Sequence, residues 1–204
     1  MVVSSQTDIE KIHEEDYFKK LLQALLNIQG KYETFVTLDT SDTYKIQRAE
    51  RVFAYELYHQ YRCLMHNTDQ MILNGELYKD TSIFDKLNGF KCYPDLVLHS
   101  DYTETSPNLQ YFICEIKMAH NPNLLSDFTK LQKIKQTGLK FKYNIFICLG
   151  LSMQELKQKL SKQQKNVVHE MDIVCICKKN GVVEYSYLNK LSSTPCMNQN
   201  FDCP

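Results

Sequence analysis

The sequence predicts an α/β protein with a central mixed β-sheet flanked by helices, in the order ααβββαβαββ. Short apolar runs of strand length alternate with longer stretches whose apolar residues recur at helical spacing. Glycine, proline and Asn-Gly pairs separate these segments, as is typical of turns between elements. Alternation of this kind is typical of helices packed on a sheet rather than of a helical bundle or a β-sandwich.

Composition is that of one soluble globular domain. The chain has 204 residues, of which 43% are hydrophobic and 24% charged, near the averages for globular proteins. The longest apolar run, "IFICLGL", is far shorter than the roughly 20 residues that a membrane helix needs. The N-terminus turns acidic where a signal peptide would be apolar, so export is not expected. We expect a single domain over 1–190 with a helical N-terminal extension (1–42), and a loose tail over 191–204.

Cysteine placement indicates a reducing compartment. Four of the eight cysteines lie at irregular spacing in apolar, strand-like runs, where free cysteine behaves as a small hydrophobe: Cys114, Cys148, Cys175 and Cys177. Cys196 and Cys203 in the tail lack the close CxxC spacing and the nearby histidines of a zinc site. A cytoplasmic location follows as the expectation.

Two helices are expected before the sheet. Thr7 and Glu10 have the S/T-x-x-E form of a capping box, and apolar residues at near-helical spacing follow over 8–28, up to Gly30. After the polar stretch "LDTSDTYK", a second helix is expected over about 44–65.

Three strands and a third helix follow. "MILNGELYK" reads as a strand with a turn or bulge at its Asn-Gly pair, and further strands are expected over 92–99 and 111–118. Asn121 and Pro122 begin a helix that Gly138 ends.

The C-terminal part adds three strands and one helix. "YNIFICLGL" is a strand, and Ser152 and Glu155 form a second capping box that begins a helix to about residue 165. "DIVCICKK", Asn180-Gly181 and "VVEYSYL" have the sequence form of a hairpin with a type I′ turn.

Charged residues occur in two of these apolar strands. Asp95 follows Pro94 at the head of one, and Glu115 and Lys117 lie two residues apart in the other. Because side chains alternate along a strand, Tyr111, Ile113, Glu115 and Lys117 share one face, and Phe112, Cys114 and Ile116 the other. If the two strands are neighbours, Asp95, Glu115 and Lys117 converge at one edge of the sheet. Adjacent carboxylates repel unless a cation lies between them, and Mg²⁺ binds such oxygens while keeping waters that a substrate phosphate can displace.

Pro94-Asp95 followed by Glu115-Ile116-Lys117 resembles the motif of the PD-(D/E)xK nuclease superfamily. Its members share a restriction-endonuclease-like core of a helix, three strands, a helix and a strand, which the expected elements over about 44–150 resemble. The resemblance implies that Asp95 and Glu115 bind Mg²⁺, with Mn²⁺ as a substitute, and that the Ile116 carbonyl adds a ligand. It also implies that Lys117 serves the attacking water. An ion pair between Asp95 and Lys117 at a strand end is the structural alternative.

Many relatives contribute a glutamate from the helix before the sheet. Glu50 and Glu56 lie at the two edges of its apolar stripe, about 60° to either side of Phe53 on a helical wheel. The context "FAYELYHQ" resembles the acidic position of bacterial relatives, so Glu56 is preferred over Glu50 as the catalytic helix carboxylate.

Five residues are candidates for contact with nucleic acid. Aromatic and basic side chains on the second helix are suited to binding single-stranded nucleic acid. Lysines on the third helix lie where the superfamily often places phosphate contacts. A histidine three residues after Lys117 could act as a general acid or contact the substrate. These residues are Tyr58, Arg62, Lys130, Lys133 and His120. The alternatives are that Tyr58 and Arg62 only pack around their helix, that the two lysines lie on a solvated helix face, and that His120 is a capping or loop histidine.

Charge is unevenly distributed although the net charge is zero. Residues 121–190 hold 12 lysines against five acidic residues, and residues 1–120 hold 12 basic against 18 acidic residues. A basic C-terminal half suits phosphates, and a solvated lysine-rich face is the alternative.

We expect a Mg²⁺-dependent endonuclease or exonuclease acting on DNA, alone, as a homodimer or with a partner protein, and not at a membrane. The alternative is a catalytically inactive module with the nuclease fold that binds nucleic acid or a protein.

Overall fold

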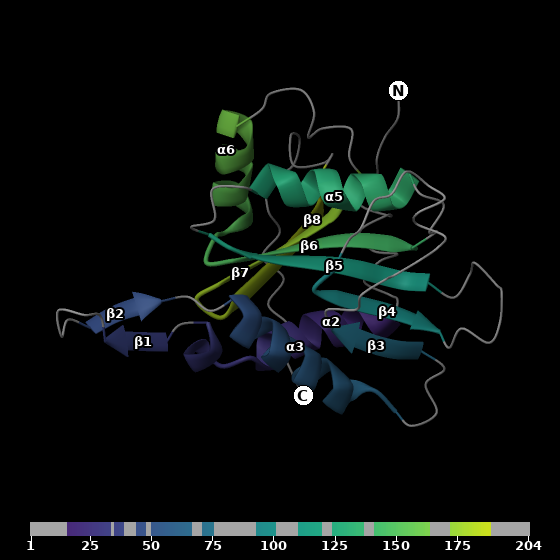
Figure 1. The fold of residues 1–204 in the computed structure, drawn as a ribbon, viewed down its shortest axis with the longest axis horizontal. Coiled ribbons are helices and arrows are strands. Elements are labelled where there is room, and N and C mark those ends of the chain that lie inside the picture. The colour runs from purple at the N-terminus through teal and green to yellow at the C-terminus, as the bar shows by residue number, and fades with distance from the viewer. Residues whose placement is uncertain are drawn as a thin grey trace.

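The described part of the chain contains a six-stranded mixed sheet with four helices (Figure 1). The computed structural model describes residues 16–33, 35–38, 44–47, 50–66, 71–75, 93–100, 110–119, 124–136, 141–163 and 172–188. The expected order ααβββαβαββ is confirmed for the helices and the strands of this sheet. The Thr7–Glu10 capping box, His120, Cys196, Cys203 and the tail lie outside the described residues.

The four helices lie within the ranges expected for them. They are α2 (Asp16–Asn27), α3 (Glu50–Leu64), α5 (Leu124–Gln136) and α6 (Met153–Gln163), and a short 3-10 turn, η1 (Gly30–Tyr32), follows α2. None of these described helices combines the length and the apolar character that crossing a bilayer requires.

The strands of the sheet lie in the spatial order β3-β4-β5-β6-β7-β8, which is also their order in the chain. They are β3 (Met71–Gly75), β4 (Leu96–Ser100), β5 (Gln110–Met118), β6 (Tyr143–Leu149), β7 (Val174–Lys179) and β8 (Val182–Tyr187). The central strands β5, β6 and β7 are parallel, and the outer pairs are antiparallel. Parallel neighbours need crossover connections, which here contain α5 and α6.

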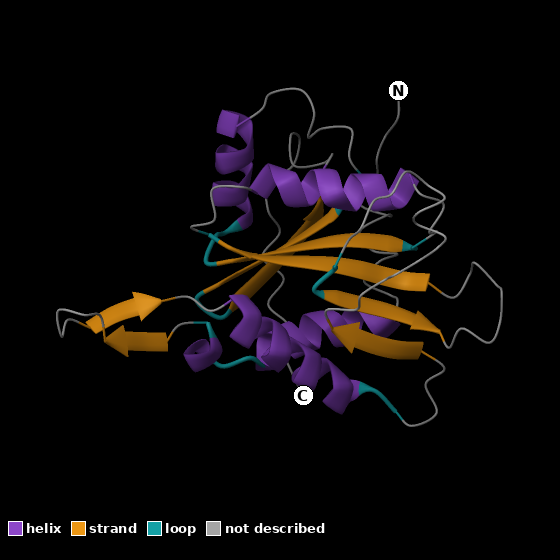
Figure 2. Cartoon of the chain, in the orientation of Figure 1, coloured by secondary structure: helices purple, strands orange, loops and turns teal. Residues whose placement is uncertain are grey.

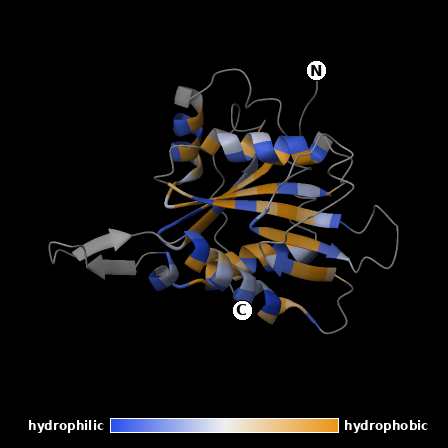
Figure 3. Ribbon diagram, viewed as in Figure 1, coloured by the Kyte–Doolittle hydropathy of each residue, from blue (hydrophilic) through white to orange (hydrophobic). Residues whose placement is uncertain are grey.

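The helices cover the two faces of the sheet (Figures 1 and 2). Helices α5 and α6 lie on one face and bury residues such as Phe128 and Leu156 there; α2 and α3 lie on the other and bury Phe18 and Phe53. Figure 3 shows the central strands as mostly apolar, as is typical of parallel strands buried on both faces.

The alternation expected along β5 holds with one exception. Ile113 packs with the α5 side, and Phe112 and Cys114 pack with the α2 side, as expected. Tyr111 also packs on the α2 side, against Tyr17, and the expectation that it shares a face with Ile113 is wrong. The reason is a bulge in the pairing with β4, which places one extra residue on β5 and turns two successive side chains the same way.

A two-stranded hairpin precedes α3, where the sequence predicted loop and helix. Its strands are β1 (Phe35–Leu38) and β2 (Tyr44–Gln47), which pair in antiparallel fashion and lie to one side of the main sheet in Figure 1. The N-terminal extension is therefore not helical throughout, and α3 begins at Glu50 rather than near residue 44. Ile46 stands at helical spacing from Ala49 and Phe53, which explains the early predicted start.

Two local signals have the predicted geometry. The Ser152 N–H donates to the Glu155 carboxylate at 2.7 Å, and the Glu155 N–H donates to Ser152 Oγ at 3.3 Å, so the capping box is formed. Asn180 and Gly181 have φ values of 52° and 79°, and the positive φ at both positions is the requirement of a type I′ turn.

The four strand cysteines are buried and unbridged, as expected. Burial in the apolar sheet raises the pKa of Cys114 and of Cys175. Both stay protonated at neutral pH and act as packing residues.

Lys178 is a buried cation that joins β7 to the end of α2. Its Nζ donates to the carbonyls of Leu25 and Ile28, each at 2.7 Å, and lies 3.1 Å from Glu33 Oε1. The residue is only 1% exposed. It satisfies carbonyls that the end of a helix leaves without partners, and it therefore fixes α2 on the sheet.

Candidate active site

Asp95 and Glu115 lie side by side at the end of the sheet where β4 begins. Leu96, the first residue of β4, pairs with Cys114 of β5, and this antiparallel register continued by one step sets Asp95 against Glu115. The charge of Asp95 acts on Glu115, as this closeness requires. Residues directly opposite in antiparallel strands share a face, so the two carboxylates are neighbours. Pro94 is tolerated just before β4 because no ladder donor is needed there.

Asp95 is fixed by the backbone of β5. The Ile116 N–H donates to Asp95 Oδ2 at 2.6 Å. In a strand the N–H and C=O of one residue point to the same side. The Ile116 carbonyl therefore also points toward Asp95, at the end of the sheet just before β4 begins. Burial raises the pKa of Asp95, although the Ile116 hydrogen bond and Lys117 oppose the shift.

Glu115 is the most buried acidic group of the site. It is 1% exposed, and its Oε1 lies 2.5 Å from Nζ of Lys130, which comes from α5. Lys130 also donates to the Tyr93 carbonyl at 2.8 Å. Burial, and then the charge of Asp95, raise the pKa of Glu115 to about 8 despite the ion pair with Lys130. Two close carboxylates in a buried place thus make the negative charge at Glu115 costly.

Lys117 pairs with Glu50 in the first turn of α3. Their Nζ and Oε1 atoms are 2.7 Å apart. Burial lowers the pKa of Lys117, but the Glu50 hydrogen bond and the charge of Asp95 outweigh it, and the net shift is upward. Lys117 is therefore a fixed positive charge at neutral pH.

The structure places Glu50, and not the preferred Glu56, beside Lys117. Glu56 Oε1 accepts a hydrogen bond from Gln60 of the same helix at 2.7 Å, whereas Glu50 reaches Lys117. Both flank the apolar stripe, but Glu56 lies about 9 Å further along the helix axis. Their different positions along the helix axis, which a helical wheel does not show, explain why Glu50 rather than Glu56 contacts Lys117.

Asp127 of α5 belongs to the same group of charges and was missed in the sequence. Its Oδ2 is buried and has no hydrogen-bond partner among the described residues. Burial raises its pKa, while Lys117 and Lys130 lower it. The signal available in the sequence was its i,i+3 spacing to Lys130, which places both side chains on one face of the helix.

These side chains form what we call the charged cluster: Glu50, Asp95, Glu115, Lys117, Asp127 and Lys130. Four carboxylates against two ammonium groups leave a formal charge of −2 when all are ionised. In the part of the chain that the structure describes, no three acidic, histidine or cysteine side chains are arranged as a ready-made metal site. The two lysines lie among the carboxylates instead.

The other predicted contact residues lie on α3 and α5, except His120, which lies outside the described residues. Tyr58 is half-buried and lies beside Gly75 of β3, which also lies next to the backbone carbonyl of Asp95. Arg62 is exposed in the last turn of α3, at the opposite end of the helix from Glu50. Lys133 is exposed on α5, one turn after Lys130. Among the four candidates that lie in the described residues, Lys130 has a side chain that pairs with a member of the cluster.

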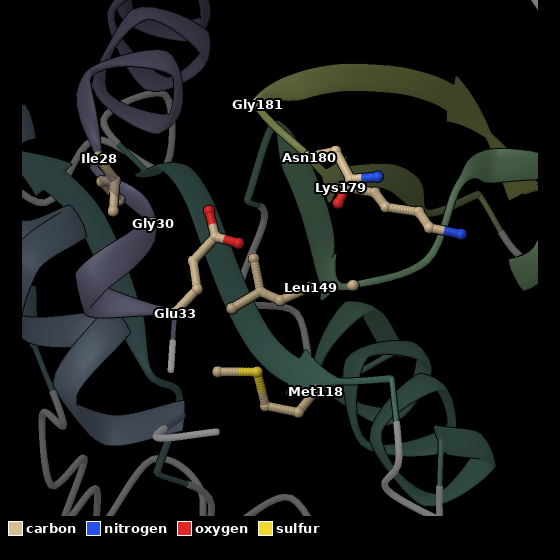
Figure 4. A pocket seen from close by; sticks show the side chains of 9 residues that line it. Ile28, Gly30, Glu33, Met118, Leu149, Lys179, Asn180 and Gly181 are labelled. Atoms are coloured by element: carbon tan, nitrogen blue, oxygen red, sulfur yellow. The ribbon is translucent and has the colours of Figure 1, made fainter. Parts of the chain in front are cut away.

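A hollow of about 360 Å³ lies at the carboxyl ends of the parallel strands, beside η1 (Figure 4). Met118, Leu149 and Glu33 line it, and the side chain of Lys179 points away from it toward Glu155. Glu33, the acidic side chain of this lining, is paired with Lys178. The hollow therefore lacks the concentration of charge that distinguishes the cluster.

In comparisons with known proteins, no family model, no curated protein and no solved structure matches this chain.

Proposed function

We propose that the protein is a metal-dependent nuclease that hydrolyses DNA phosphodiester bonds through a PD-(D/E)xK site with a restriction-endonuclease-like fold. The main support is that Asp95 and Glu115, from adjacent strands, stand side by side at one sheet edge. Lys117, two residues beyond Glu115, interacts electrostatically with Asp95.

The order of elements is consistent with this proposal. Helix α3, strands β3, β4 and β5, helix α5 and strand β6 follow one another as in the core that the motif implies. Asp95 directly precedes β4, and Glu115 and Lys117 lie in the C-terminal part of β5, beyond its pairing with β4 and still paired with β6.

The charged cluster suits a divalent cation by its chemistry. Its formal charge of −2 when all groups are ionised equals what one such ion neutralises. Burial, and then the charge of Asp95, raise the pKa of Glu115, and a cation bound there would oppose both effects. Carboxylate and carbonyl oxygens are the ligands that Mg²⁺ prefers. Asp95, Glu115 and the Ile116 carbonyl would hold the ion.

In this proposal each side chain has a distinct role. Bound Mg²⁺ would supply Lewis-acid polarisation of a phosphoryl oxygen. Lys117, kept charged and held by Glu50, would orient the water that attacks phosphorus and would stabilise the charge that develops there. Because its pKa is raised, Lys117 acts as a positive charge rather than as a base. The phosphorus bond to the leaving oxygen breaks as the bond to water forms.

Cleavage of linear, nicked and single-stranded DNA by the pure chain tests the proposal. We expect hydrolysis with Mg²⁺ or Mn²⁺, none with EDTA, and none from Asp95→Ala or Glu115→Ala, both of which should remain folded because each removes repulsion. Activity that survives Asp95→Ala would point to another site or a contaminant. Absence of cleavage by the wild-type chain on all these substrates would contradict the proposal.

A non-catalytic module that binds nucleic acid or a partner protein is the second candidate. It is favoured by the pairing of Glu115 with Lys130 and of Glu50 with Lys117, and by the lack of a ready-made group of three ligands among the described residues. Binding of DNA that is unchanged by EDTA and by Asp95→Ala, without cleavage, would support this candidate.

A further inference from the structure

The ammonium group of Lys130 lies beside Glu115, the most buried carboxylate of the charged cluster. Its Nζ is 2.5 Å from Glu115 Oε1 and 2.8 Å from the Tyr93 carbonyl oxygen. The Glu115 side chain is 2% exposed, whereas the Lys130 side chain is 23% exposed. The ammonium group therefore reaches from the rim of the cluster into its interior, where it contacts the Glu115 carboxyl group.

A divalent cation on Glu115 would compete with this ammonium group. Mg²⁺ binds oxygens at about 2.0–2.1 Å, so an ammonium within hydrogen-bond distance of the same carboxylate would be its close neighbour. Like charges that close repel strongly, and burial strengthens the repulsion. Lys130 has a flexible four-carbon stem and comes from a helix, so it can leave Glu115 without any change in the sheet.

Asp127 offers the displaced ammonium group a second partner. It precedes Lys130 by three residues on α5, so the two side chains lie on one helix face. Asp127 Oδ2 is buried and has no hydrogen-bond partner among the described residues. An acceptor that lacks a donor thus lies beside the residue that a metal ion would displace.

We propose that Lys130 exchanges partners when the metal binds: its ammonium pairs with Glu115 in the metal-free protein and with Asp127 in the metal-bound protein. The inference rests on the proposed function, because it takes Asp95 and Glu115 as the metal ligands. In both states the buried Glu115 carboxyl group has a cation beside it, either Lys130 or the metal ion. It also makes metal affinity depend on two residues that do not bind the metal.

Calorimetric titration of the full chain with Mn²⁺ tests the exchange through a double-mutant cycle. Lys130→Gln removes the competitor and should tighten binding at least tenfold, whereas Asp127→Asn removes the second partner and should weaken binding several-fold. In the Lys130→Gln background, Asp127→Asn should have little effect, because it acts through Lys130. Lys133→Gln, on the same helix but outside the cluster, should bind as the wild type does.

Two results would overturn the exchange while leaving the proposed function intact. One is binding that Asp95→Ala abolishes but Lys130→Gln does not tighten. The other is an equal effect of Asp127→Asn in both backgrounds, which would mean that Asp127 acts on the metal directly. Absence of Mn²⁺ binding by both the wild type and Lys130→Gln would overturn the exchange and the proposed function together.

A second measurement covers the case in which Lys130→Gln fails to fold. With isotope-labelled lysine in the otherwise unaltered chain, the side-chain NMR signal of Lys130 is identified by its absence from Lys130→Arg. Addition of Mg²⁺ should shift this signal in the wild type, and should shift it differently in Asp127→Asn. A Lys130 signal that does not respond to bound Mg²⁺ would contradict the exchange.

Discussion

Lys117 and Glu50 form an ion pair of 2.7 Å that joins β5 to the first turn of α3. The two residues are far apart in the sequence, and their contact brings the helix carboxylate to the sheet edge that holds Asp95. The pair therefore defines which helix residue belongs to the proposed active site.

Glu50→Gln should lower the DNA cleavage rate by about 10- to 100-fold, the usual cost of losing a carboxylate that orients an active-site group. Glu56→Gln is the matched control on the same helix and should cleave at nearly the wild-type rate, because Glu56 contacts Gln60. Initial rates at saturating Mg²⁺ give the comparison. An equal loss in Glu56→Gln would contradict the placement of Glu50.

Lys117→Met should lower the cleavage rate by at least about 100-fold without weakening metal binding. Its ammonium repels a nearby cation, so its removal cannot reduce the attraction of Asp95 and Glu115 for the metal. Single-turnover rates together with Mn²⁺ titration separate the two effects. Weakened Mn²⁺ binding in this variant would contradict a role limited to the water and the phosphate.

Lys178→Met should destabilise the fold by about 2–4 kcal/mol, because it leaves two buried carbonyls and the Glu33 carboxylate without their donor. Lys179→Met is the control on the same strand and should cost less than about 1 kcal/mol, since the Lys179–Glu155 pair is largely solvated. Urea unfolding of the two variants measures the difference. Similar losses of stability in both variants would contradict the role of Lys178 in fixing α2 on the sheet.

Metal-free protein should lose stability as pH rises from about 4.5 to about 8. Glu115 has a pKa near 8 in the fold and near its ordinary 4.5 when unfolded, so in this window the folded chain binds more protons than the unfolded chain. The free energy of unfolding therefore falls as pH rises. Urea unfolding in EDTA at several pH values measures this slope.

The matched variant for that slope is Glu115→Gln, which cannot titrate at this position. Its stability should fall less over the same pH range than that of the wild type. Parallel curves for the two proteins would show that Glu115 is ionised at an ordinary pKa, and that the carboxylates of the cluster do not disfavour each other's charge.

Much of the sheet was predictable because its signals are local. Alternation of apolar residues, the capping box at Ser152 and the Asn180-Gly181 turn each depend on neighbours in the chain. The hairpin of β1 and β2 was missed because its strands are only four residues long and because Ile46 continues the helical spacing of α3. Tyr111 was placed on the wrong face because a bulge depends on the partner strand.

The candidate site was predictable only in its strand residues. Asp95, Glu115 and Lys117 follow from strand alternation and adjacency, and the structure brings them to one edge. The choice of Glu50 depends on where α3 begins relative to the sheet, and the membership of Asp127 depends on how α5 packs. Both are tertiary relationships that spacing in the sequence does not contain.

The most direct test of the central claim is the location of Mn²⁺ in crystals of the wild-type chain, measured by anomalous diffraction after a soak. The proposal predicts an ion between Asp95 and Glu115, within coordination distance of the Ile116 carbonyl, and no ion there in Asp95→Ala crystals. Soaked crystals without an ion between these carboxylates, from protein that cleaves DNA with Mn²⁺ in solution, would contradict it.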